Sequence, residues 1–229
     1  MAKKVFLGVG HGGADSGAVG NGLKEKDLNL QIALECQKVL VRHGVTVGMS
    51  RTKDENDTLN EEIKECNAFN PDLAVDIHNN AGGGDGAEAF HHYGGGTGKT
   101  LAINILEAIV AIGQNSRGAK TRKNDRGTDY YGFIRETKAP AVIVECAFID
   151  NAKDIQIIDT LAEQKTMGVA IAKGILKTLG IAYVEEKKTE TKTESGKIYR
   201  VQVGAYSVKA NAEAMQKKLK AAGFDAIIV

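Results

Sequence analysis

Three residues with side chains suited to metal binding or proton transfer stand where short apolar runs give way to polar or glycine-rich segments. They are His11, His78 and Glu145, and the runs before them cover residues 5–9, 73–77 and 141–144. Short apolar runs bounded by turn residues are typical of buried strands, and in open α/β sheets chemistry gathers beyond the carboxyl ends of the strands. We therefore expect the three side chains to meet at one edge of a single sheet.

Two histidines and a carboxylate facing one cavity are a donor set for zinc that leaves a fourth position open. His11 and His78 are the expected nitrogen ligands. Glu25 is the best candidate for the third ligand, because it lies at the entry of a predicted helix, after a glycine-rich loop that can fold it back over the sheet edge. Glu145 is then free to act as a general base. Zinc in such a site lowers the pKa of its bound water to about 7 and polarises a carbonyl, which suits amide hydrolysis.

Two further histidines compete with Glu25 for the third ligand position. His91 and His92 are neighbours in a predicted strand, so their side chains point to opposite faces and at most one could enter the site. We expect positions at the surface or at the rim of a substrate site for both. Structural interpretations also exist for each candidate: a histidine after a strand is commonly a polar cap, and a glutamate at a helix start complements the helix dipole.

The elements that must position these residues alternate along the chain. Strands are predicted at about 4–9, 45–49, 73–77, 87–93, 133–135 and 141–144, and helices at about 26–42, 59–69, 98–113 and 154–179. Residues 114–131 are polar and basic without periodicity, which is typical of a functional or flexible loop. The alternation predicts an α/β fold with a twisted, mixed, mostly parallel sheet flanked by helices.

The last part of the chain has a different character. Residues 185–197 contain no apolar side chain and are predicted to be a linker, so we divide the chain into a catalytic domain (1–182), a linker (183–197) and a small terminal piece (198–229). That piece has strand patterns at 198–203 and 226–229 around a helical stripe, a β-α-β unit too small for a stable core of its own. It either docks, dimerises or continues further.

Composition restricts the partners. The formal net charge of +1 gives no reason to expect nucleic acid, and no apolar run approaches the length of a membrane span. No signal-peptide pattern follows the first residues, so we expect synthesis in the cytoplasm and action elsewhere only after release.

The basic run 117–126 is interpreted as a solvated loop with room to contact an anionic substrate, and Arg51 and Asp54 as structural residues. The three cysteines, Cys36, Cys66 and Cys146, are interpreted as reduced core thiols.

Four motifs carry a resemblance to a known family. They are GHGGADSGA (10–18), GLKEKDLN (22–29), DIHNNA (76–81) and PAVIVECAFIDN (140–151), and together they resemble the zinc-dependent N-acetylmuramoyl-L-alanine amidases of the type 3 amidase family. The resemblance covers about residues 3–180. It implies that His11, Glu25 and His78 bind Zn²⁺ and that Glu145 is the catalytic glutamate. The implied reaction is hydrolysis of the amide joining N-acetylmuramic acid to the L-alanine of the stem peptide in peptidoglycan. Asp76 is a departure, since many members have serine there.

The terminal piece resembles the opening half of a SPOR domain, over residues 199–207 and 212–229. That family binds peptidoglycan glycan strands, typically ones without stem peptides, and only one β-α-β half is present here. The leading hypothesis is therefore a cell-wall lytic amidase, either a phage endolysin released through a holin or a bacterial autolysin. A zinc exopeptidase and a catalytically inactive wall-binding protein are the alternatives, and the oligomeric state stays open.

Overall fold

The computed structural model describes residues 2–186, 202–221, 224 and 226–228. The chain divides into two compact units, residues 1–185 and 186–229. In the first unit six strands form one sheet in the order β4-β1-β5-β8-β6-β7. The strands are β1 (Lys4–Val9), β4 (Thr46–Met49), β5 (Leu73–Asn80), β6 (Ala87–His91), β7 (Ser116–Lys120) and β8 (Ala141–Phe148).

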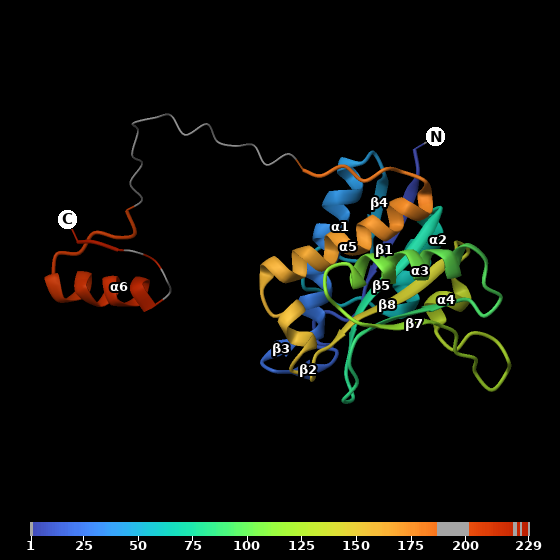
Figure 1. Ribbon diagram of the computed structural model, residues 1–229, viewed down its shortest axis with the longest axis horizontal. Helices are drawn as coiled ribbons and strands as arrows, with labels where there is room; N and C mark the ends of the chain where they lie inside the picture. The colour runs from blue at the N-terminus through green and yellow to red at the C-terminus, as the bar shows by residue number, and fades with distance from the viewer. Residues whose placement is uncertain (1, 187–201, 222–223, 225, 229) are drawn as a thin grey trace. The chain divides into compact units, whose positions relative to one another are not determined.

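The sheet is mixed and mostly parallel (Figure 1). Strands β4, β1, β5 and β8 run parallel to one another, β6 pairs with β8 in the antiparallel direction, and β7 is parallel to β6. A separate small hairpin, β2 (Val19–Gly20) with β3 (Leu23–Lys24), lies in the loop between β1 and the first helix. The predicted fold class is confirmed for this unit.

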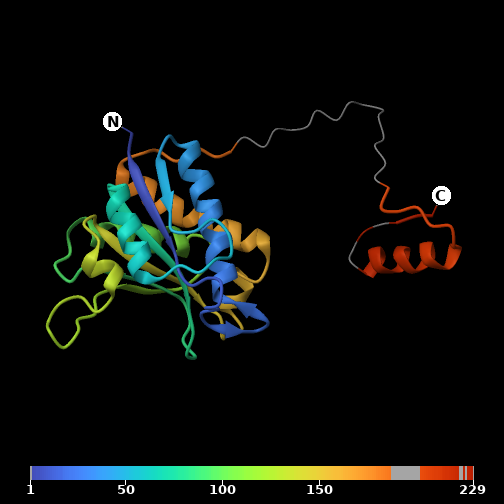
Figure 2. The same cartoon turned by 180° about the vertical axis from the view of Figure 1, so that it is seen from behind.

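Alternation along the central strands assigns the two faces of the sheet to two helical layers. One face carries residues such as Leu7, Val75 and Val144, which join the large core under the long helices. These helices are α1 (Glu25–Arg42), α3 (Gly96–Val110) and α5 (Leu161–Leu179). The opposite face carries Phe6 and Ala74 in a smaller core, covered by α2 (Leu59–Phe69) and α4 (Gly132–Glu136). Figure 2 shows the layers from behind.

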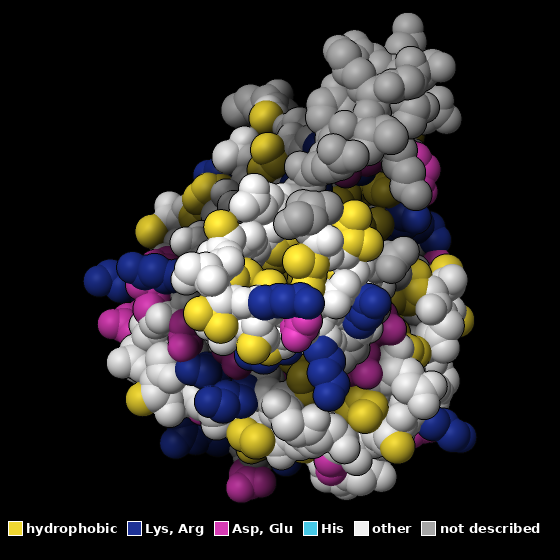
Figure 3. Space-filling view, turned by 90° about the vertical axis from the view of Figure 1, so that its left-hand side faces the viewer, with side chains coloured by type: hydrophobic (Ala, Val, Ile, Leu, Met, Phe, Trp, Pro, Cys, Tyr) yellow, Lys and Arg dark blue, Asp and Glu magenta, His cyan; other side chains and the backbone are white. Residues whose placement is uncertain are grey.

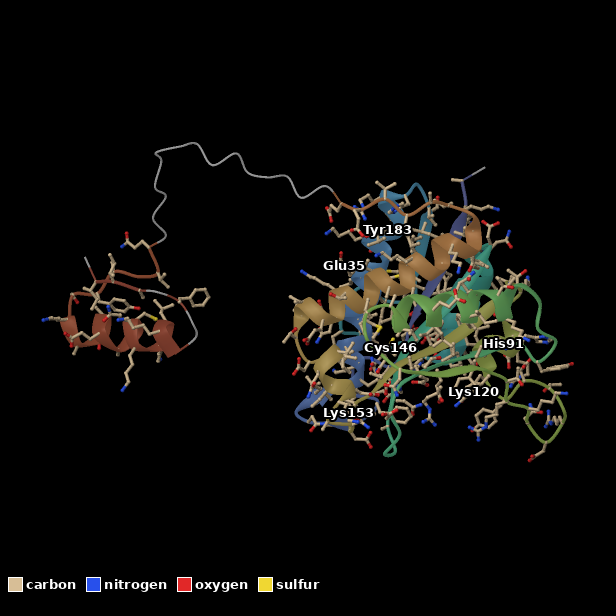
Figure 4. All side chains as sticks on the ribbon, viewed as in Figure 1. Glu35, His91, Lys120, Cys146, Lys153 and Tyr183 are labelled. Atoms are coloured by element: carbon tan, nitrogen blue, oxygen red, sulfur yellow. The ribbon has the colours of Figure 1, made fainter. Side chains whose placement is uncertain are left out.

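The local causes of these elements are visible in the chain. Helix α1 ends at Arg42, and after its C-cap His43 comes Gly44 with a φ of 76°, a left-handed conformation that suits glycine. Helix α2 begins with a capping box between Thr58 and Glu61, and its last residue is followed by Asn70 in a left-handed conformation. The free cysteines Cys36, Cys66 and Cys146 are all buried, as predicted, and Cys146 lies on β8 (Figure 4).

Three predicted segments are corrected by the structure. The segment 114–131 contains the edge strand β7, which escapes the sequence pattern because its half-exposed residues are mostly polar or small. The predicted strand at 133–135 is the short helix α4, whose Phe133 and Ile134 are buried in the smaller core. The predicted helix 154–179 is a 3-10 turn (Asp154–Ile157) followed by α5, because Thr160 and Glu163 form a capping box that starts a new helix.

Strands β5 and β8 also extend further than predicted. The sequence places His78 and Glu145 just after strand ends, whereas both lie within strands that continue to Asn80 and Phe148. The reason is that the β5–β8 ladder persists through these polar residues, with His78 directly opposite Glu145.

In the second unit the described helix is α6 (Lys209–Ala221). The predicted strand at 198–203 lies mostly outside the described residues, and the described residues 202–203 and 226–228 adopt no strand. None of the helices in the described parts of the chain is both long and apolar enough to cross a membrane.

On the face shown in Figure 3, basic and acidic side chains are interspersed, in keeping with a formal net charge of +1.

Candidate functional site

Three of the four predicted site residues, His11, Glu25 and His78, lie close together at the carboxyl ends of β1 and β5. His11 follows β1 with a φ of 63°, a left-handed conformation that a residue other than glycine adopts rarely. His78 lies near the end of β5, on the face that α2 and α4 cover, and Glu25 is the first residue of α1. The ligand atoms of these three side chains all lie within 4.8 Å of one another.

Each histidine directs one ring nitrogen at a different oxygen of the Glu25 carboxylate. Nε2 of His11 lies 3.2 Å from Oε2, and Nδ1 of His78 lies 3.0 Å from Oε1. The two rings meet edge to face, with centroids 5.1 Å apart. Two imidazole nitrogens and a carboxylate therefore point at one shared space.

The other nitrogen of each ring faces a second carboxylate. Nδ1 of His11 lies 2.8 Å from Oδ2 of Asp15, and Nε2 of His78 lies 3.2 Å from Oδ2 of Asp76. A carboxylate that accepts a hydrogen bond from the outer nitrogen fixes the ring and leaves the inner nitrogen free to bind a metal. This pairing of both outer nitrogens is the arrangement typical of metal-binding histidines.

The Glu25 carboxylate is held by backbone amides from two segments. The amide of Ala18 donates to Oε2 at 2.8 Å, and the amide of Asn79 donates to Oε1 at 3.1 Å. Burial by itself raises the pKa of Glu25, but the hydrogen bonds from His11 and His78 outweigh burial and leave the pKa well below its usual range. The Glu25 side chain is therefore ionised, and its negative charge favours a cation at this position.

The histidine pKa values shift in the opposite direction. The hydrogen bond to Glu25 raises the pKa of His11 above its ordinary value. Burial lowers the pKa of His78, yet the charge of Asp76 and hydrogen bonds to Asp76 and Glu25 together raise it well above that value. The cluster therefore has a strong affinity for positive charge, which protons satisfy when no metal is bound.

Glu145 is the fourth predicted site residue, and it lies beside the cluster. It is the register partner of His78 on the neighbouring strand, so the two side chains share a face of the sheet. Its Oε2 atom is buried and has no hydrogen-bond partner among the described residues. Burial raises the pKa of Glu145 to about 7; His78 opposes the shift, and the nearby carboxylates Glu25, Asp76 and Glu88 add to it. A carboxylate with such a pKa is suited to exchange protons near neutrality.

The donor set and its surroundings fit a zinc ion. Two imidazoles and one carboxylate are the ligands of an open catalytic zinc site, and outer carboxylates orient both rings. Glycine at position 17 makes room for this arrangement, since a Cβ there would lie 2.6 Å from both Oε2 of Glu25 and Cδ2 of His11. The structure therefore fits zinc through the chemistry of the donors and through the unpaired Oε2 of Glu145.

A polar rim adjoins Glu145 on β6 and β7. Glu88 is the register partner of Glu145, and it accepts hydrogen bonds from Asn80 at 3.0 Å and from Arg117 at 2.8 Å. Lys120 also pairs with Glu88. Arg117 and Lys120 of the basic run therefore lie in strand β7 and form ion pairs with Glu88 beside the site. The interpretation of these two residues as part of a solvated loop was wrong. Glu88 was missed, although it lies one strand away from Glu145.

The competing histidines lie away from the cluster. His91 is buried on the opposite face of the sheet, where its Cβ lies 3.9 Å from the position that a Cβ on Gly98 of α3 would occupy. A surface or rim position was wrong for His91, because residues 87, 89 and 91 of β6 face the large core side. His92 is exposed and pairs with Asp129 at 3.2 Å. Neither belongs to the group that could hold a metal.

Arg51 and Asp54 support the backbone around the site. The buried guanidinium of Arg51 donates to the carbonyls of Val9 and Lys26, at 3.0 and 2.7 Å. Asp54 accepts from the amide of Gly13 and from the Lys26 ammonium, both at 2.7 Å. These contacts agree with a structural role for both residues.

Comparison with known proteins places the chain in a family. Residues 5–177 match the Amidase_3 family, described as N-acetylmuramoyl-L-alanine amidase, and residues 172–229 match the SPOR domain. The sporulation-specific N-acetylmuramoyl-L-alanine amidase of Bacillus subtilis (strain 168) is 35% identical over 230 residues, covering 99% of this chain and 84% of the relative. The endolysin of Bacillus phage SPP1 is 34% identical over 212 residues, covering 86% of this chain and 74% of the phage protein.

Solved structures agree with the sequence matches. Cwp6 from Clostridium difficile is 39% identical with a TM-score of 0.77, covering 78% of this chain and 30% of that one. The catalytic domain of CwlV, an N-acetylmuramoyl-L-alanine amidase from Bacillus (Paenibacillus) polymyxa var. colistinus, is 29% identical with a TM-score of 0.70, covering 79% and 99%. The chain therefore belongs to the Amidase_3 family of cell-wall N-acetylmuramoyl-L-alanine amidases and ends in a SPOR domain.

Proposed function

We propose that the chain is a zinc-dependent hydrolase that cleaves the amide between N-acetylmuramic acid and L-alanine in peptidoglycan. His11, Glu25 and His78 would hold the metal, and Glu145 would be the general base. The observation that carries the proposal is the convergence of two inner imidazole nitrogens on Glu25 while both outer nitrogens face carboxylates. When bound there, zinc supplies a Lewis acid that polarises a carbonyl and makes a water molecule acidic near neutral pH.

The role of Glu145 follows from its position and its unpaired oxygen. Oε2 takes a proton from the attacking water as the water oxygen adds to the lactyl carbonyl carbon. Glu145 then gives the same proton to the alanine nitrogen as the carbon–nitrogen bond breaks. The products are a muramic acid with a free lactyl carboxylate and a peptide with a free L-alanine amino group, so one water molecule is consumed for each bond cleaved.

The proposal extends to the whole chain. Residues 1–182 would form the amidase, 183–197 a linker and 198–229 a partial SPOR-like piece that recognises glycan strands. Peptidoglycan would then be the partner of both parts, through its stem peptide at the amidase and its glycan at the tail. The enzyme would act on the cell wall. The match of residues 172–229 to the SPOR domain supports the assignment of the tail.

Mass spectrometry of the products from a defined disaccharide-peptide tests the proposal. The expected products are the free disaccharide, with its lactyl carboxylate, and the intact stem peptide. Glu145→Gln should form them at least about a hundredfold more slowly, because general-base catalysis contributes roughly 10²–10⁴-fold. A shortened peptide still attached to muramic acid would instead identify an exopeptidase, and unchanged turnover in Glu145→Gln would remove the proposed base.

A further inference from the structure

Two buried carboxyl groups behind His78 lack partners for one oxygen each. Glu62 of α2 and Asp76 of β5 are 6% and 2% exposed. Oε1 of Glu62 and Oδ1 of Asp76 have no hydrogen-bond partner among the described residues. An unpaired buried oxygen is costly, so two of them in one place call for a physical explanation.

The two oxygens occupy the same small space beside Gly8. Gly8 is the register partner of Asp76 on β1, and a Cβ at residue 8 would lie 2.1 Å from Oε1 of Glu62 and 2.8 Å from Oδ1 of Asp76. The absence of a side chain at residue 8 is therefore what gives these carboxyl groups their space. Two ionised carboxylates would repel one another strongly there, whereas one proton between them forms a hydrogen bond that satisfies both oxygens.

Electrostatics around Glu62 agrees with this geometry. Burial, followed by the charge of Asp76, raises the pKa of Glu62 well above its ordinary value. The geometry and the raised pKa of Glu62 together favour a proton on Glu62, which the Glu62 carboxyl group can donate to Oδ1 of Asp76.

The other oxygen of Asp76 connects the pair to the candidate metal site. Oδ2 of Asp76 lies 3.2 Å from Nε2 of His78, and Nδ1 of the same ring lies 3.0 Å from Glu25. The corresponding carboxylate of the other histidine is very different, because the Asp15 side chain is 69% exposed whereas that of Asp76 is 4% exposed. His78 is thus oriented from the protein interior, and the orientation of Asp76 depends on what holds its second oxygen.

We propose that Glu62 is a positioning residue for the metal site, whose carboxyl group donates a hydrogen bond to Asp76 and thereby holds Asp76 on Nε2 of His78. The inner Nδ1 is then the only nitrogen of that ring left to bind zinc. This inference rests on the proposed function, since it assigns to Glu62 an effect on zinc bound by His78.

Zinc affinity of the full chain, measured by competition with a chromophoric chelator, tests the proposal. Glu62→Gln keeps a donor toward Asp76 and should bind zinc within about threefold of the wild type. Glu62→Met has a similar size but no donor, and should bind zinc about 10–100-fold more weakly, the usual effect of losing an outer partner of a metal ligand. Glu65→Gln, an exposed carboxylate on the same helix, is the matched control and should leave the affinity unchanged.

A double-mutant cycle separates positioning from a general effect on folding. In an Asp76→Ser background residue 62 has no carboxylate to hold, so adding Glu62→Met should change the zinc affinity by less than about threefold. The double variant contains neither carboxyl group of the pair, which keeps the measurement possible if Glu62→Met alone folds poorly.

Three results would contradict these claims, and they are distinguishable. Full zinc affinity in folded Glu62→Met overturns the positioning role alone. An equal loss from Glu62→Met in both backgrounds also overturns it, because the effect would then not pass through Asp76. Failure of the wild type itself to bind zinc overturns the proposed function together with this inference.

Discussion

Gly10 and the imidazole of His78 pack directly against one another. A Cβ on residue 10 would lie 2.1 Å from Cε1 and 2.3 Å from Nε2 of the ring, distances that no real Cβ tolerates. The backbone after β1 therefore forms one wall of the space in which His78 is held.

Gly10→Ala should displace the His78 ring and weaken zinc binding by at least about tenfold, since the ring can no longer keep both of its carboxylate partners. The measurement is a zinc competition titration of the full chain. Gly98→Ala on α3 is the matched control, because a Cβ on residue 98 would lie an ordinary 3.4 Å from its nearest atom, the carbonyl oxygen of Ala141, and should not alter the affinity. Equal zinc affinity in Gly10→Ala and the wild type would show that the ring position is unimportant.

Glu145→Gln should stabilise the metal-free protein at neutral pH. Because burial raises the pKa of Glu145 from 4.5 to about 7, the folded state binds more protons than the unfolded state between these values, and the free energy of unfolding falls as the pH rises through this window. Removing the charge should increase the free energy of unfolding by roughly 1–3 kcal/mol at pH 8 and change it little at pH 4. Urea unfolding of both proteins at the two pH values measures the difference. A destabilised Glu145→Gln protein at pH 8 would contradict this explanation.

Zinc affinity should increase with pH and continue to increase above pH 6.5. The pKa values of His11 and His78 are raised above 6.5 by Glu25 and Asp76, so protons occupy the ligand nitrogens over a wider range of pH and compete with the metal. Competition titrations at several pH values between 5.5 and 8.5 measure this dependence. An affinity that is already constant below pH 6.5 would mean that the histidines are not the ligands, or that their pKa values are not raised.

Arg51→Met should destabilise the first unit by roughly 2–4 kcal/mol, because it removes the side-chain donor to the carbonyls of residues 9 and 26 and one of two side-chain donors to the carbonyl of residue 10. Lys53→Met, on the same loop with an exposed side chain, is the control and should change stability by no more than about 0.5 kcal/mol. Chemical unfolding with urea gives both values. Similar urea unfolding midpoints for the two variants would show that the Arg51 side chain does not stabilise the first unit.

The parts of the fold that the sequence predicted well are those with strong local signals. Strand β1 and helix α2 have the predicted bounds, because an apolar run ending in glycines and a helix stopped before Asn70 and Pro71 are encoded within a few residues. Strand β7 was missed because an edge strand with Arg117 and Lys120 has no apolar pattern. The helix break before Thr160 carried a capping-box signal that the continuous apolar face obscured.

For the candidate site, too, the features with local sequence signals could be predicted and those that depend on packing could not. The positions of His11, His78 and Glu145 after apolar runs were enough to predict that they share one sheet edge, and the structure brings the two histidines and Glu25 together beside Glu145. Their roles remain predictions. The partner Glu62 could not be predicted, because its contact with Asp76 depends on how α2 packs across the sheet.

The most direct test of the account is the amount of zinc bound per chain at equilibrium, in the wild type and in Glu25→Ala. We predict one zinc ion per wild-type chain and a large loss in Glu25→Ala, whose two remaining imidazoles cannot hold the metal tightly. A wild-type chain that binds no zinc, or a Glu25→Ala chain that binds one as tightly as the wild type, would contradict the central claim.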